Sequence, residues 1–123
     1  MLNPSFYHIS QQQVAENGDL LYDLKLNAEH PVFQGHFPGQ PVVPGVFTTQ
    51  IIQELVENHT GKKLRFVKAR KIKFLMMIDP TVGTEISVKL TVKPDGDEYA
   101  ADATALFKNQ PCLKINARYA AEL

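Results

Sequence analysis

The first pattern along the chain is an alternation of apolar and polar positions in its first thirty residues. Every second residue of segment 20–26 is a large apolar or aromatic one: Leu20, Tyr22, Leu24 and Leu26. A period of two residues is typical of a strand with one buried face. We predict a second strand over residues 6–14. The intervening 17-NGD-19 favours a hairpin turn, so the chain should begin with an antiparallel hairpin.

A longer period follows from Val46 to about His59. Apolar residues recur there at three- to four-residue spacing over a wide arc: Val46, Phe47, Ile51, Ile52, Leu55 and Val56. This spacing predicts an amphipathic helix. Polar residues Gln50, Glu54 and Glu57 should share its other side. Gly61 follows the pattern as a stop signal.

Beyond Gly61 the chain returns to runs rich in β-branched and aromatic residues. We predict four further strands, over residues 64–78, 85–93, 98–108 and 113–121. Turn sequences separate them: 79-DPTVG-83, 94-PDGD-97 and 109-NQP-111. One long helix followed by consecutive strands favours an α+β fold, in which an antiparallel sheet wraps around the helix. A length of 123 residues suits a single domain, residues 1–123.

Composition describes an ordinary soluble chain, with 44% hydrophobic residues and 13 basic against 13 acidic residues. We expect no signal peptide, no membrane span and no nucleic-acid partner. The single Cys112 excludes an internal disulfide, and no Cys/His spacing indicates a metal site, so no metal or cofactor is expected. A reducing, cytoplasmic location is the resulting expectation.

The charge is unevenly distributed. Residues 58–78 contain no Asp or Glu but hold seven of the thirteen basic residues: Lys62, Lys63, Arg65, Lys68, Arg70, Lys71 and Lys73. We call these seven residues the basic run. Such a run favours an anionic partner. The competing interpretation is a solvated strand with cations on its outer face.

The segment 29–57 carries the candidate chemistry. It holds two His, four Pro and three Gly, and leads directly into the predicted helix. Pro fixes φ and Gly permits positive φ, so the loop should be conformationally constrained. A rigid loop that places a His beside a helix N-terminus brings a base close to electropositive N–H donors.

The loop 35-GHFPGQPVVPGV-46 resembles the signature of the hot-dog-fold 3-hydroxyacyl-[acyl-carrier-protein] dehydratases. The later segment 68-KARKIKFLMMIDPTVGTEISVKLTV-92 is similar to that family as well. The resemblance implies a hot-dog fold, in which the sheet curls around the central helix and two protomers pair edge to edge. It also implies a lyase that removes water from 3-hydroxyacyl groups on the phosphopantetheine arm of acyl carrier protein, in fatty-acid or related acyl-chain biosynthesis.

The resemblance implies roles for individual residues. His36 corresponds to the catalytic base, and an imidazole suits proton abstraction near neutral pH. The Gly45 N–H would polarise the thioester carbonyl. The Val42 carbonyl would fix the imidazole tautomer. The residues expected to contact the substrate are Phe37, Val42, Val46 and Phe47.

Position 50 departs from the family pattern. Where the family places a Glu or Asp that reaches the site from the partner protomer, this chain has Gln50, and an amide has no dissociable proton to give. Four explanations stay open. Gln50 orients the hydroxyl while His36 performs both proton steps; Glu54 replaces the acid; a different hot-dog subunit supplies it; or the chain binds acyl groups without turning them over.

Other features are given simpler interpretations. We expect His30 to be a loop histidine rather than a metal ligand, and Glu54 to be a solvated or interface carboxylate. We expect a homodimer or higher homo-oligomer, with a hot-dog heterodimer as the alternative. The basic run favours acyl carrier protein and leaves coenzyme A open. Alternative functions are a non-catalytic acyl-carrier-binding subunit paired with a complete dehydratase, and a hot-dog thioesterase.

Overall fold

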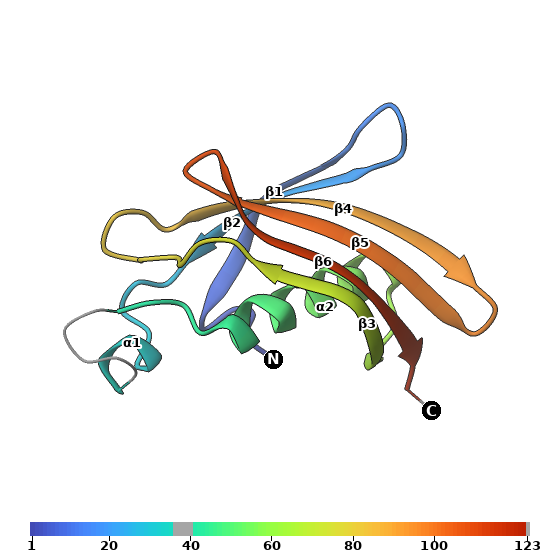
Figure 1. The fold of residues 1–123 in the computed structure, drawn as a ribbon, viewed down its shortest axis with the longest axis horizontal. Helices are drawn as coiled ribbons and strands as arrows, with labels where there is room; N and C mark the ends of the chain where they lie inside the picture. The colour runs from blue at the N-terminus through green and yellow to red at the C-terminus, as the bar shows by residue number, and fades with distance from the viewer. Residues whose placement is uncertain (36–40, 123) are drawn as a thin grey trace.

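The computed structural model of the chain describes residues 1–35 and 41–122. It contains the strands β1 Tyr7–Val14, β2 Leu20–Leu26, β3 Leu64–Phe74, β4 Glu85–Asp95, β5 Glu98–Phe107 and β6 Gln110–Ala121, and the helices α1 Val32–Gly35 and α2 Gly45–Thr60. The strands form one antiparallel sheet in the order β1-β2-β4-β5-β6-β3, which curves over α2 (Figure 1). The predicted α+β architecture is confirmed.

Helix α2 and the first hairpin form where the hydrophobic pattern predicted them. Gly18 adopts φ +91° in the hairpin turn, and Gly61 adopts φ +70° after α2. The Gly61 N–H donates to the Glu57 carbonyl at 2.8 Å, which ends the helix in the left-handed conformation that glycine allows.

The core lies between α2 and the concave face of the sheet. The helix contributes Ile51, Ile52, Leu55 and Val56, all nearly inaccessible to solvent. The sheet contributes alternate residues of its central strands, such as Leu90 and Leu113. Burial of these side chains supplies the main stabilisation of the fold and holds α2 in place.

The predicted strand over residues 64–78 is too long, because β3 ends at Phe74. The ladder between β3 and β6 runs as far as the pair Phe74 and Leu113. Beyond it, the Leu75 N–H donates to the Cys112 carbonyl at 2.9 Å, and the next residue of β6 is Pro111, which has no N–H. The chain then leaves the sheet, and the Ile78 carbonyl accepts from the Val43 N–H at 2.9 Å.

The last predicted turn is also displaced. Lys108 and Asn109 adopt φ +53° and +64°, and Phe107 pairs with Gln110, so the turn occupies 108–109 rather than 109–111. Two residues with positive φ match the right-handed twist of the flanking strands. Strand β6 therefore begins at Gln110, three residues before the predicted start at Leu113.

Within residues 1–35 and 41–122, no helix is both long enough and apolar enough to span a membrane.

Candidate active site

The segment that leads into α2 lines an apolar pocket of about 600 Å³. Val42, Val43, Pro44 and Gly45 form one side of it, and residues 74–78 form the other, with Thr48 and Cys112. The bond between the Val43 N–H and the Ile78 carbonyl holds the two sides together. The structure thus brings the predicted Val42 and Gly45 to one cavity. The predicted residues His36 and Phe37 lie outside the described residues.

Gly45 is the first residue of α2, and Pro44 at the N-cap provides no side-chain cap. The N-terminal N–H groups of a helix carry partial positive charge, so this end of α2 suits a developing negative charge. A Cβ on Gly45 would lie 3.0 Å from Cε1 of Phe74 and 3.1 Å from Cζ. Glycine therefore lets the Phe74 ring close against the helix start at the wall of the pocket.

A second pocket, of about 250 Å³, contains the side chain of Gln50. Its walls come from three elements: Val46, Thr49, Gln50 and Gln53 of α2, Phe66 and Ile72 of β3, and Ile115 and Tyr119 of β6. Burial raises the pKa of Tyr119 to about 12, so its phenol is neutral near pH 7. Gly45 and Gln50 therefore line different pockets of the same chain.

The Gln50 amide is held by a buried carboxylate one turn later on α2. The Gln50 Nε2 donates to the Glu54 Oε2 at 2.9 Å. The Leu2 N–H donates to the same oxygen at 2.8 Å, while the Asn3 N–H and the Tyr7 hydroxyl donate to Oε1 at 3.1 Å and 3.0 Å. Burial by itself raises the pKa of Glu54. The hydrogen bonds from Leu2, Gln50, Asn3 and Tyr7 together outweigh burial and hold that pKa below its ordinary value.

The expectation that Glu54 is a solvated or interface carboxylate is wrong, because the residue is 4% exposed. The helix pattern placed Glu54 on a polar face, but the N-terminal segment folds back over that face and supplies hydrogen-bond donors (Figure 1). Because the carboxyl is held in its ionised form, it has no proton to give. The geometry therefore argues against Glu54 as the replacement acid.

Two other predicted residues lie apart from these pockets. The ring of Phe47 makes an edge-to-face contact with Phe6, at a centroid distance of 4.9 Å, and lines neither pocket. His30 packs on the same Phe6, and its Nδ1 accepts from the Val32 N–H at 3.1 Å. His30 is thus a loop histidine, as predicted. In the described part of the chain no group of three or more His, Cys, Asp or Glu side chains could hold a metal ion.

All seven residues of the basic run are exposed on β3 and the turn before it. Among the described residues, the ion pairs join Lys89 to Asp19 and Arg118 to Asp95 and Glu98, so none involves the basic run. Strand register places Lys68 opposite Arg118 and Lys73 opposite Lys114. Sequence reasoning missed Lys114, which joins this surface only through the pairing of β3 with β6.

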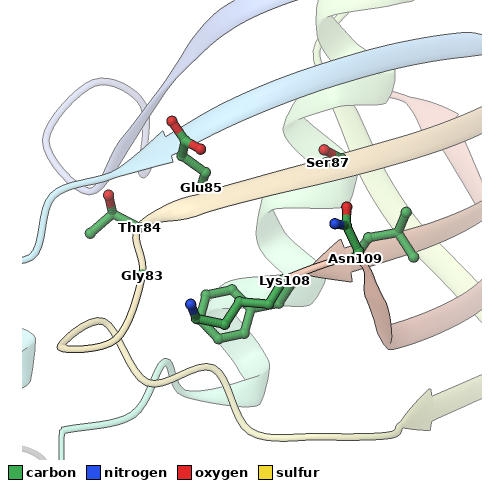
Figure 2. Close-up of a pocket in the computed structure, with 8 residues that line it drawn as sticks. Gly83, Thr84, Glu85, Ser87, Lys108 and Asn109 are labelled. Atoms are coloured by element: carbon green, nitrogen blue, oxygen red, sulfur yellow. The ribbon is translucent and has the colours of Figure 1, made fainter.

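A third pocket, of about 390 Å³, lies at the start of β4 and the turn between β5 and β6. Figure 2 shows its polar side chains, which include Thr84, Glu85, Ser87, Lys108 and Asn109. None of the predicted site residues lines this pocket.

A six-stranded antiparallel sheet curved over one long helix, with a Pro- and Gly-rich loop leading into that helix, defines the hot-dog class. Residues 11–109 match the model of the ApeI-like family, described as ApeI dehydratase. This match covers most of the chain, and the chain belongs to that family. The predicted hot-dog fold and the resemblance to the dehydratases are confirmed.

Individual relatives agree with this assignment. A 3-hydroxyacyl-[acyl-carrier-protein] dehydratase FabZ of Syntrophobacter fumaroxidans is 32% identical over 89 residues, which are 65% of this chain and 59% of that protein. The FabZ of Alkaliphilus metalliredigens is 29% identical over 104 residues, 74% of this chain and 71% of the relative. The dehydratase heterocomplex ApeI:P from Xenorhabdus doucetiae shares the fold, with a TM-score of 0.65 and 16% identity over 92% of this chain and 96% of that chain. The chain thus spans about three fifths of the length of the first of these relatives, and both are described as dehydratases.

Proposed function

We propose that the chain catalyses the dehydration of 3-hydroxyacyl thioesters carried on acyl carrier protein. The observation that carries the proposal is the position of the Gly45 N–H, at the start of α2, beside an apolar pocket of about 600 Å³ and within the signature loop 35–46. An apolar cavity suits an acyl chain, and a helix N-terminus suits the enolate oxygen that forms when C2 loses its proton.

The proposed reaction needs no proton from position 50. His36 takes the proton from C2, while the Gly45 N–H donates to the thioester oxygen as charge develops on it. Gln50 accepts a hydrogen bond from the 3-hydroxyl and orients it. The imidazolium then returns the proton to the hydroxyl oxygen as the C3–O bond breaks. Water leaves, a C2–C3 double bond forms, and His36 is neutral again.

We place each site between two protomers. Gly45 and Gln50 are five residues apart on α2, about 7.5 Å along its axis, and they line different pockets. Strand β3 lies at the edge of the sheet, and it carries exposed apolar side chains there, including Phe66 (50% exposed) and Phe74 (57% exposed). Such edges and patches are typical of association surfaces. Pairing along β3 would bring Gln50 of one protomer to the loop of its partner.

A second candidate is a heterodimer with another hot-dog subunit. Antiparallel pairing of β3 with its own copy brings the two basic runs together, and like charges on adjacent strands are destabilising. A partner with an acidic edge avoids this cost and could supply the carboxylate that position 50 lacks. The Xenorhabdus structure that shares this fold is itself described as a heterocomplex.

A thioesterase has less support. Hydrolysis needs a carboxylate or an activated water at the thioester carbonyl, and in the described residues no carboxylate lines the pocket beside Gly45.

For the partner, we propose acyl carrier protein docked on the basic run in the cytoplasm. The support is that all seven cations are exposed and that none forms an ion pair within the described residues. Acidic partners are attracted to such surfaces over distances of about 10 Å.

A mixing experiment tests the composite site. His36→Ala and Gln50→Leu should each be nearly inactive in dehydration of 3-hydroxyacyl carriers. After co-refolding at equal concentration, mixed dimers hold one site with both His36 and Gln50, so about one quarter of the wild-type rate should return. No recovery, although subunit exchange is verified by mass spectrometry, would favour the heterodimer or the binding subunit instead.

A further inference from the structure

We propose that Glu54 is a positioning residue for Gln50, and that the pair makes position 50 the group that recognises the 3-hydroxyl of the acyl chain. This inference rests on the proposed function, because it names the substrate group that Gln50 contacts. It starts from the buried carboxylate that α2 presents toward the N-terminal segment and β1.

The Glu54 carboxylate accepts two hydrogen bonds on each oxygen. Oε2 accepts from the Leu2 N–H and the Gln50 Nε2, and Oε1 accepts from the Asn3 N–H and the Tyr7 hydroxyl. An ionised carboxylate has no donor of its own. It therefore attracts the NH₂ group of the amide and repels the amide oxygen. This fixes which end of the Gln50 amide faces Glu54.

The amide oxygen of Gln50 is then the end left for the substrate. Among the described residues no protein donor bonds to it, and its pocket is lined mostly by apolar and aromatic side chains such as Val46, Phe66 and Ile115. A hydroxyl on the ligand can satisfy this acceptor. A ligand that fills the pocket without a hydroxyl shields this half-buried acceptor from solvent and does not pair with it, which weakens binding.

Binding can be measured without turnover in the His36→Ala background. The probes are 3-hydroxyoctanoyl-acyl carrier protein and octanoyl-acyl carrier protein, which differ only in the hydroxyl. We expect the hydroxylated probe to bind about fivefold more tightly, the value of one well-made hydrogen bond. In His36→Ala/Glu54→Gln the preference should fall to about one, because an amide at position 54 no longer selects one orientation of Gln50.

Tyr7→Phe provides the matched control. It removes a donor from the same carboxylate, but on Oε1, and leaves the contact between Oε2 and Gln50 in place. It should destabilise the fold and keep the fivefold preference. The proposal is overturned if the parent shows no preference, if Glu54→Gln retains it, or if Tyr7→Phe loses it equally.

A second measurement needs no folded Glu54 variant. The side-chain NH₂ resonance of Gln50 in the wild-type protein, assigned by its loss in Gln50→Leu, should move as acid protonates Glu54. If the Gln50 NH₂ resonance does not move as the pH is lowered, the hydrogen bond between Gln50 and Glu54 is contradicted. Failure of the proposed function gives a different result: wild-type protein that prefers the hydroxylated probe but releases no water retains the positioning role and loses the enzymatic one.

Discussion

At the scale of single residues, Glu54 shows how a buried charge is tolerated in this core. Taking a carboxylate out of water is costly, and here four donors replace the lost hydration. The carboxylate therefore links the N-terminal segment and β1 to α2, and it also orients Gln50, which lines the second pocket beside Thr49 and Gln53 of the same helix. Stability and recognition depend on the same group.

Glu54→Gln should lower the free energy of unfolding at neutral pH by about 1–3 kcal/mol, since an amide cannot accept from all four donors. The folded-state pKa of Glu54 lies below its ordinary value, so this stabilisation is present above the unfolded-state pKa and is lost as pH falls through the folded one. Urea unfolding across an acidic pH series should show the difference between wild type and variant shrinking. Tyr7 has a raised pKa and stays neutral throughout this range, so Glu57 is the nearby charged group to account for when the unfolding data are fitted. A difference that stays constant down to strongly acidic pH would contradict this assignment.

Gln50→Glu should raise the dehydration rate near neutral pH. The new carboxyl would lie within hydrogen-bond distance of Glu54, and two carboxylates that close cannot both ionise, so the pair should retain a proton and provide an acid. In Gln50→Glu/Glu54→Gln the neighbouring charge is absent, so the alkaline limb of the pH–rate profile, where the new acid loses its proton, should move to lower pH. Identical profiles for the two variants would show that the carboxyls do not interact.

At the scale of elements, the N-terminal end of α2 is defined by the contact between its first residue and the end of β3. Gly45 has no Cβ, so Phe74 approaches to a distance at which any other residue would crowd it. The Ile78 carbonyl and the Val43 N–H join the same two segments. The wall of the pocket beside Gly45 thus depends on where β3 ends.

Gly45→Ala should reduce kcat/KM for dehydration by about 10²-fold, because the added methyl and a displaced Phe74 shift the bound thioester away from the Gly45 N–H. Stability should change by less than about 1 kcal/mol, because the Phe74 ring is 57% exposed and can rotate away. Phe74→Leu combined with Gly45→Ala should recover part of the loss by relieving the crowding. Unchanged kinetics in Gly45→Ala would remove Gly45 from the site.

Periodicity predicted α2 and the first hairpin nearly to the residue because local burial dominates both. The predicted end of β3 and the predicted start of β6 were wrong because both depend on a neighbouring strand. Pro111 of β6 ends the ladder with β3, and the turn at Lys108 and Asn109 sets where β6 begins. The burial of Glu54 could not be predicted from the residue pattern of α2 either. Its donors at Leu2 and Asn3 are 52 and 51 positions away along the chain, and no local pattern joins them. The short α1 was also unpredicted, since four residues give no period.

At the scale of the whole molecule, one sheet edge combines three properties. Strand β3 has a single neighbour, it exposes aromatic and apolar side chains, and it carries most of the basic run. Apolar side chains favour association, whereas the cations favour an anionic partner. The two roles are compatible when the dimer forms along the edge and acyl carrier protein binds across its basic face.

Charge reversal of Lys68 and Lys71 should slow association with acyl carrier protein and flatten its salt dependence, because steering by the basic face is lost. Reversing the exposed Lys25 and Lys93, on β2 and β4, makes the same change in net charge elsewhere and is the matched control. Stopped-flow binding at several salt concentrations measures both. If reversing Lys25 and Lys93 changes the association rate as much as reversing Lys68 and Lys71, the basic run is a solvated face and not the docking surface.

The central claim is that this chain removes water from a 3-hydroxyacyl group through His36 despite the amide at position 50. The most direct measurement is intact-protein mass spectrometry of 3-hydroxyacyl-acyl carrier protein incubated with purified wild-type chain and with His36→Ala. We predict that the carrier loses the mass of one water with wild type and stays unchanged with His36→Ala. An unchanged carrier mass with the wild-type chain, under conditions where binding to the carrier is demonstrated, would contradict the account.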